Sequence, residues 1–107
     1  MIEAKIYVGL NDKEKHEQIF SLEKYKSIVK SICRNYRVNF SLYILEGGYF
    51  HEDNSSYVEE NTIMITLIGI AKETIDEIAK DICAFFNQES VMIVYNPVNV
   101  FSVKENL

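Results

Sequence analysis

The order of apolar periodicities along the chain constrains its fold more than any other feature. Four segments have the apolar patterns of strands: Lys5–Leu10, 38–46, 62–70 and 90–95. The third of these is apolar on both faces, as a central strand should be. Two segments carry apolar residues at spacings of three and four as amphipathic helices do: Leu22–Tyr36 and Ile75–Phe85. The predicted order is therefore strand, helix, strand, strand, helix, strand.

This order predicts an α+β protein of the ferredoxin-like βαββαβ type, with a single domain over residues 1–107. Right-handed crossovers place both helices on one face of a four-stranded antiparallel sheet. The first and third strands are then central, and the fourth strand lies at an edge. Pro97, which has no N–H to donate to a neighbouring strand, agrees with an edge position.

The ends of both predicted helices carry recognisable capping residues. Ser21 is expected to be the N-cap of the first helix, and Thr74 with Glu77 has the spacing of a capping box in the second. Asn87 is a candidate C-cap, and Gln88 could satisfy free carbonyls at the same helix end.

The sheet face opposite the helices is expected to be apolar. If Ile6 and Val8 face the helices, the open face receives Tyr7, Tyr43 and Leu45, with further apolar residues from the third and fourth strands. A solvated face would alternate with charged residues, and large apolar patches usually mark an interface or a ligand groove. We therefore expect a homo-oligomer, with a dimer favoured, and a possible small-molecule ligand between sheets.

The composition argues against two classes of partner. The net charge is −5 and the pI is about 5.0, whereas nucleic-acid binding depends on Lys and Arg side chains that neutralise phosphates. The sequence has no apolar run of the ~18 residues that a transmembrane helix needs. The N-terminal segment "MIEAKIYVGL" carries charges within its apolar pattern, so it resembles a strand rather than a signal peptide. We expect a cytoplasmic protein that binds neither nucleic acid nor membranes.

The two cysteines and two histidines do not suggest a metal site or a disulfide. Cys33 and Cys83 fall near the ends of the two predicted helices, without a C-x-x-C spacing, and are expected to be free thiols. His16 lies in a charged segment and is expected to be exposed. The residues indicate no metal and no cofactor.

The stretch "EGGYFHEDNSSYVEENT", residues 46–62, is predicted to be a long loop between the second and third strands. It supplies Tyr49 and His51 as ligand or interface candidates. His51 could act as a general base, but the sequence shows no nucleophile beside it. The carboxylates of this stretch could bind a cation, but their spacing lacks the pattern of a calcium loop. Mobility or contact with a partner is the favoured interpretation of loop 46–61.

The segment "FFNQESVMI", together with Glu60 before it and "NPVNVF" after it, resembles a family of small bacterial proteins of unknown function. That family has an F-x-Q-E-[SA]-V signature in a ferredoxin-like domain. The resemblance covers roughly the second half of the chain. It implies that Glu60, Gln88 and Glu89 are functionally important, but it supplies no reaction.

Two functional hypotheses follow from these residues. The favoured one is a self-associating small-molecule-binding or regulatory module that uses the open sheet face and is not an enzyme. The alternative is a dimeric α+β enzyme with a pocket between sheets, lined by Tyr7, Tyr43 and loop residues. The sequence assigns no catalytic residue, and a cavity that contains a perturbed acid or base would favour the enzyme.

Overall fold

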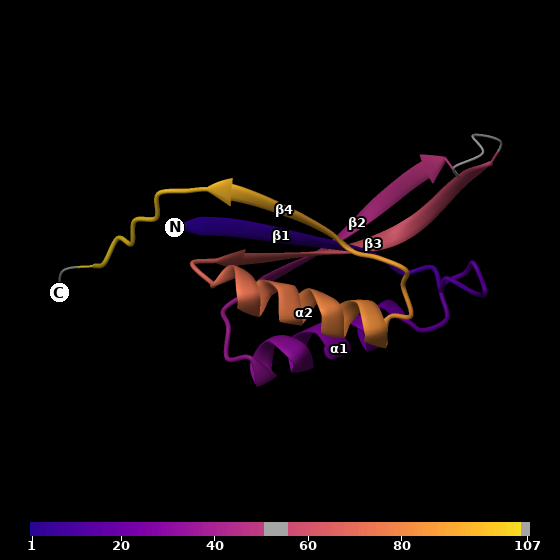
Figure 1. The fold of residues 1–107 in the computed structure, drawn as a ribbon, viewed down its shortest axis with the longest axis horizontal. Coiled ribbons are helices and arrows are strands. Elements are labelled where there is room, and N and C mark those ends of the chain that lie inside the picture. The colour runs from indigo at the N-terminus through magenta and orange to yellow at the C-terminus, as the bar shows by residue number, and fades with distance from the viewer. Residues whose placement is uncertain (51–55, 106–107) are drawn as a thin grey trace.

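The computed structural model describes residues 1–50 and 56–105. Figure 1 shows the elements, which follow the predicted order: β1 (Ile2–Gly9), α1 (Leu22–Asn35), β2 (Ser41–Phe50), β3 (Tyr57–Ile68), α2 (Lys72–Phe85) and β4 (Met92–Pro97). Among these residues, no helix is long and apolar enough to cross a membrane.

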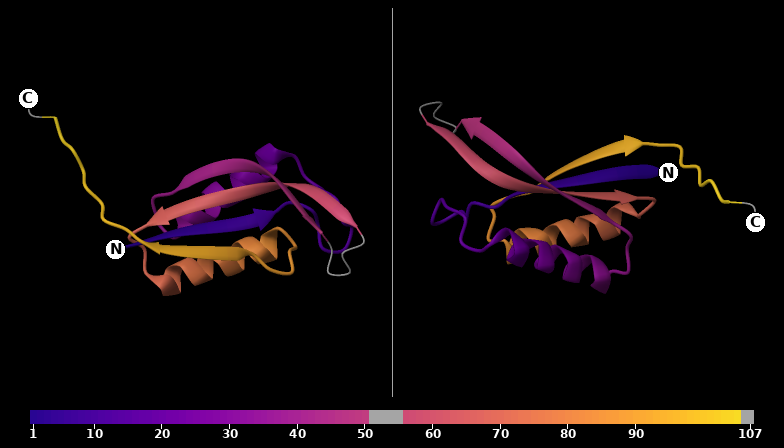
Figure 2. Two further views of the ribbon diagram at one scale, coloured as in Figure 1. Left: turned by 90° about the horizontal axis from the view of Figure 1, so that it is seen from above. Right: turned by 180° about the vertical axis from the view of Figure 1, so that it is seen from behind.

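The strands form one antiparallel sheet in the order β2-β3-β1-β4, so the predicted ferredoxin-like fold is confirmed. Both helices cover one face of the sheet, and no other element in residues 1–50 and 56–105 covers the opposite face (Figures 1 and 2). Strand β4 lies at the edge, where Pro97 is opposite Ile2. Strand β1 begins at Ile2 rather than Lys5, because its first residues also pair with β3 and β4.

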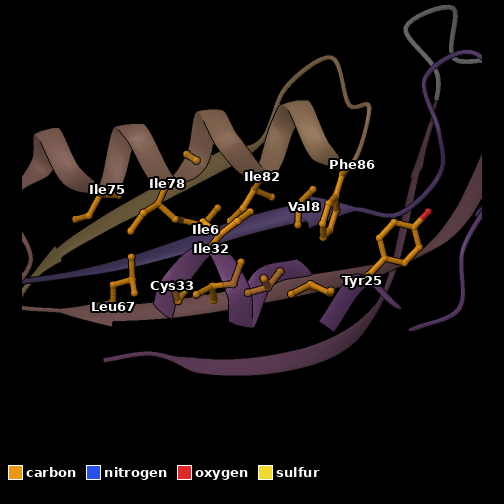
Figure 3. Close-up of a cluster of buried hydrophobic side chains, with 14 of the residues drawn as sticks. Ile6, Val8, Tyr25, Ile32, Cys33, Leu67, Ile75, Ile78, Ile82 and Phe86 are labelled. Carbon is orange, nitrogen blue, oxygen red and sulfur yellow. The ribbon is translucent and has the colours of Figure 1, made fainter. Parts of the chain in front are cut away.

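The core lies between the sheet and the helices. Figure 3 shows side chains of β1, β3, α1 and α2 converging in this layer. Successive residues of a strand point to opposite faces, so alternate residues of β1 and β3 are fully buried against the helices. The buried side chains include Ile6, Val8, Val29, Ile63, Ile65, Leu67, Ile75, Ile78 and Ile82.

The start of α1 was predicted correctly, whereas that of α2 was not. Ser21 caps α1 by accepting a hydrogen bond from the backbone N–H of Lys24. Helix α2 begins at Lys72, with Ala71 as N-cap and no side-chain capping bond, so the predicted capping box at Thr74 is wrong. The chain is already turning at Gly69, whose φ is 73°, and the backbone N–H of Ile75 donates to the carbonyl of Ala71. Thr74 therefore lies within the first turn.

The stretch predicted as a long loop is mostly a β-hairpin. Strand β2 continues to Phe50 and β3 starts at Tyr57, with continuous pairing that includes Gly47 opposite Glu60. Ring contact between Phe50 and Tyr57, with centroids 5.3 Å apart, supports the outer end of the hairpin. Cross-strand pairing therefore overrides the low strand propensity of glycine and glutamate here.

Candidate functional site

A cavity of about 840 Å³ lies where the end of β1, the β2–β3 hairpin and the turn before β4 meet. Because β1 and β4 are antiparallel, the residues that follow β1 lie beside those that precede β4. The cavity is lined by Gly9, Asn11, Lys13, His16, Tyr49, Phe50, Glu60, Gln88, Glu89 and Ser90. Three regions that are distant in sequence therefore form one site.

Glu60 lies at the centre of this region. It also lines an adjoining cavity of about 300 Å³ on the open sheet face, together with Tyr7, Leu45, Tyr49 and Met92. One carboxylate oxygen, Oε2, accepts a hydrogen bond of 3.0 Å from the backbone N–H of Asn11. The carboxylate lies so close to Gly9 that a Cβ atom there would overlap it. Glycine at position 9 is therefore what allows the carboxylate to occupy this place.

Tyr49 lies beside this carboxylate and is 43% exposed. Partial burial, and secondly the negative charge of Glu60, raise the pKa of the Tyr49 phenol above its ordinary value. Both effects disfavour the phenolate, so the hydroxyl keeps its proton at neutral pH and can donate a hydrogen bond.

The wall opposite the hairpin is held by hydrogen bonds between the β1–α1 segment and the turn after α2. The side-chain amide of Gln88 donates to the carbonyl of Asn11 at 2.6 Å. The side-chain amide of Asn87 donates to the Asp12 carboxylate at 2.7 Å, and the backbone N–H of Lys13 donates to the carbonyl of Asn87. These three bonds link the two segments at one point of the cavity wall.

Asp12 is almost fully buried, with 6% of its surface exposed. Its carboxylate accepts hydrogen bonds from the Asn87 amide and from the backbone N–H groups of Glu14 and Lys15. The bond from Asn87, followed by those from the backbone, holds the pKa of Asp12 below its ordinary value. A buried carboxylate with these donors remains ionised at neutral pH.

The site combines carboxylates, aromatic rings and one cationic side chain. Glu60 and Glu89 provide negative charge, Tyr49 and Phe50 provide aromatic surface, and Lys13 provides a cation. Carboxylates and aromatic faces both attract a positively charged ligand. The arrangement is therefore suited to an organic molecule with a cationic group and an extended flat part.

Most of the predicted site residues lie around these two cavities: Tyr7, Leu45, Tyr49, Glu60, Gln88 and Glu89. Tyr43 lies on the open face outside both linings and is 50% exposed. His51 lies outside the described residues. Gln88 was expected to satisfy carbonyls at the end of α2, but its side chain donates to Asn11 instead.

Sequence reasoning missed the contribution of the β1–α1 segment, namely Gly9, Asn11, Lys13 and His16. The fold itself contained the signal, because a ferredoxin-like sheet places the end of its first strand beside the start of its fourth. His16 is exposed, as predicted, and adopts a positive φ of 59°.

Other reactive groups are not gathered into a second centre in residues 1–50 and 56–105. Cys33 and Cys83 are free, and burial raises the pKa of the Cys33 thiol to about 11. No cluster of three His, Cys, Asp or Glu residues in these ranges could hold a metal ion.

Comparison with known proteins gives structural likenesses only. No family model matches the chain, and no curated protein matches it. A phage SAM lyase in complex with S-methyl-5′-thioadenosine is 25% identical, with a TM-score of 0.66 over 89% of this chain and 79% of that chain. The phage SAM lyase in its apo state is 26% identical, with a TM-score of 0.66 over 89% and 78% of the two chains. CutA from Pyrococcus horikoshii, at 14% identity and a TM-score of 0.60 over 95% and 88%, shares the fold.

Proposed function

We propose that this protein binds a sulfonium nucleoside of the SAM type in the Glu60 cavity and acts on it as a lyase that releases S-methyl-5′-thioadenosine. The observation that carries the proposal is the position of Glu60, whose carboxylate lines both cavities beside Tyr49. The likeness to a phage SAM lyase, at 25% identity over 89% of this chain, supports the chemical class of the ligand.

The charge distribution of the cavity suits such a ligand. A SAM-type molecule carries a positive charge on sulfur, and a carboxylate in a partly buried site stabilises that charge. The aromatic rings of Tyr49 and Phe50 offer faces to the cation and to a purine ring. We assign Glu60 to the cationic group of the ligand.

The proposed reaction needs no oxidant, metal or water. The bond between sulfur and the amino-acid chain breaks, and its electron pair goes to sulfur, which becomes a neutral thioether. The four-carbon fragment is completed either by closure through its own carboxylate or by loss of a proton from the neighbouring carbon to a base. Identification of that fragment by mass spectrometry separates the two routes.

The decisive experiment incubates the purified chain with SAM and follows S-methyl-5′-thioadenosine by chromatography. Glu60→Gln removes the charge but keeps an acceptor for the Asn11 N–H, and we expect it to lower kcat/KM by about a hundredfold or more. Glu59→Gln is the matched control, because Glu59 is the adjacent carboxylate and does not line the cavity of about 840 Å³.

Two results would contradict the lyase. Binding of S-methyl-5′-thioadenosine in calorimetry, without turnover of SAM, would favour a binding module that is not an enzyme. An absence of both binding and turnover would refute the proposed ligand class.

The proposal includes self-association through the open sheet face. The pairing registers place four side chains in one row across this face: Tyr43, Met64, Tyr7 and Met92. Tyr43 and Met92 are 50% and 57% exposed. Covering a few hundred Å2 of apolar surface contributes several kcal/mol at ~25 cal/mol per Å2, which favours a second copy of the chain as the covering partner.

Light scattering tests this part of the proposal. Tyr7→Glu and Tyr43→Glu each place a charge in the apolar row, and we expect both variants to dissociate into monomers. Lys30→Glu, on the exposed side of α1, is the control and should keep the wild-type mass. A monomeric wild-type protein, or an unchanged mass in both row variants, would refute self-association through this face.

A further inference from the structure

Asn11 is held between two side chains from different parts of the chain. Its backbone N–H donates to Oε2 of Glu60 at 3.0 Å, and its carbonyl accepts from Nε2 of Gln88 at 2.6 Å. The N–H and the carbonyl belong to the two peptide units on either side of the Asn11 Cα atom. Fixing both units fixes the backbone at Asn11, and therefore the direction in which its N–H points toward Glu60.

We propose that Gln88 is a positioning residue for Glu60, acting through the backbone of Asn11 rather than by contact with the ligand. This inference rests on the proposed function for its catalytic consequence, but the contacts that carry it do not depend on the identity of the ligand. The amide nitrogen of Gln88 is already engaged by Asn11, and the carboxylate oriented through Asn11 is the one at the centre of both cavities.

The place of Gln88 is set by the end of α2. The backbone N–H of Gln88 donates to the carbonyl of Cys83, and that of Asn87 donates to the carbonyl of Ala84. These are the two bonds of a Schellman motif, in which the residue after the cap takes a left-handed conformation. Asn87 has a φ of 51°, as this motif requires. The Gln88 side chain therefore starts from a rigid helix end.

A second contact keeps the two segments in register. The side chain of Asn87 donates to the buried Asp12 carboxylate, and the carbonyl of Asn87 accepts from the backbone N–H of Lys13. Asn11 is thus flanked by segments that are anchored independently of its own bonds. On the other side, the absence of a Cβ atom at Gly9 leaves room for the Glu60 carboxylate beside the Asn11 N–H.

The test compares Gln88→Glu and Gln88→Ala with the wild-type chain. Gln88→Glu keeps the length of the side chain but replaces the amide donor with an acceptor, and neither change removes the backbone bonds that end α2. We expect both variants to shift the amide resonance of Asn11 in 15N NMR spectra and to speed its hydrogen exchange. Glu89→Gln, a neighbouring cavity residue, should leave the exchange of Asn11 unchanged.

Kinetics with SAM provide the functional readout. Displacement of a reacting group by about 1 Å can reduce the rate about a hundredfold, so we expect kcat/KM to fall by about tenfold to a hundredfold in the Gln88 variants. In a wild-type protein that turns SAM over, an unchanged kcat/KM in both Gln88 variants would overturn the positioning role.

The NMR measurement separates this inference from the proposed function. A wild-type protein without lyase activity would refute the lyase, while the Asn11 amide would still report on positioning. An Asn11 amide that keeps its resonance and its exchange rate in both Gln88 variants would overturn the inference, whatever the activity.

Discussion

The two helices end in the same backbone motif, but only one of these ends takes part in the candidate site. At the end of α1, Arg37 has a φ of 55° and donates to the carbonyl of Arg34, while Val38 donates to that of Cys33. At the end of α2, Asn87 with a φ of 51° donates to Ala84 in the equivalent way. The backbone geometry of the two turns is therefore the same.

The difference lies in the side chain at the left-handed position. Arg37 is exposed, so its turn simply ends a helix. Asn87 is partly buried and donates to Asp12, so its turn also holds the wall of the cavity. The same helix-ending motif therefore also stabilises the cavity wall at α2, because the Asn87 side-chain amide bonds to Asp12. Three predictions test this difference between the two turns.

The largest expected change in stability comes from replacing Asp12. Its carboxylate accepts one hydrogen bond from the turn after α2 and two from the β1–α1 segment. Its pKa in the folded protein is below the ordinary 3.8, mainly because Asn87 donates to it. The ionised carboxylate therefore contributes its full stabilisation at pH values above the pKa of Asp12 in the unfolded chain. This contribution is lost as the pH falls through the lower pKa of the folded protein. We expect Asp12→Asn to be less stable than wild type at pH 7, with a difference that narrows below about pH 4.

Urea unfolding at fixed protein concentration, from pH 7 down to about pH 2.5, measures this difference. A gap between wild type and Asp12→Asn that stays constant over the whole range would show that the Asp12 charge does not stabilise the turn.

The second prediction concerns Asn87→Gly. Glycine accepts the left-handed backbone, so the turn is kept while the bond to the Asp12 carboxylate is lost. We expect a net loss of about 1 kcal/mol in the free energy of unfolding. Hydrogen exchange of the Lys13 amide should also become faster, because that amide donates to the carbonyl of Asn87. Unchanged stability would mean that the hydrogen bond from the Asn87 side chain to Asp12 does not stabilise the fold.

The smallest effect, with the opposite sign, is expected for Arg37→Gly. A residue other than glycine is strained at a φ of 55°, and the relief outweighs the greater chain entropy of glycine in the unfolded state. We expect a gain of about 0.5 kcal/mol in urea unfolding. A loss of stability at Arg37 equal to that at Asn87 would remove the contrast between the two turns.

Much of the fold was predictable because periodicity is a local property. The apolar stripe from Leu22 to Tyr36 indicated α1, and Pro97 indicated the edge position of β4. The extension of β2 was not predictable in the same way. Gly47 and Glu60 have low strand propensity, and it is their pairing across the hairpin that keeps both strands extended.

The candidate site was predictable only in part, because its contacts join residues that are far apart in sequence. Glu60, Gln88 and Glu89 were identified by resemblance, and the structure places them together around one cavity. The partners of the turn residues were not foreseen, since Asn87 and Asp12 lie 75 positions apart and Gln88 and Asn11 lie 77 apart. Such pairs carry no signal in the periodicity of either segment.

The extension of the β2–β3 hairpin gives the cavity two walls of unequal stiffness. Strand β1 ends its pairing with β3 at Thr62, and the N–H of Leu10 donates to the carbonyl of Asn61, so residues 47–50 and 57–60 form strand pairs only with one another. A two-stranded ribbon twists more and is less stable by itself than a sheet on a helical layer. Tyr49 and Phe50 therefore lie on the two-stranded, more easily bent part of the hairpin, whereas Gln88 directly follows the end of helix α2. An incoming molecule would meet one fixed surface and one that can bend toward it, without any change in the body of the protein.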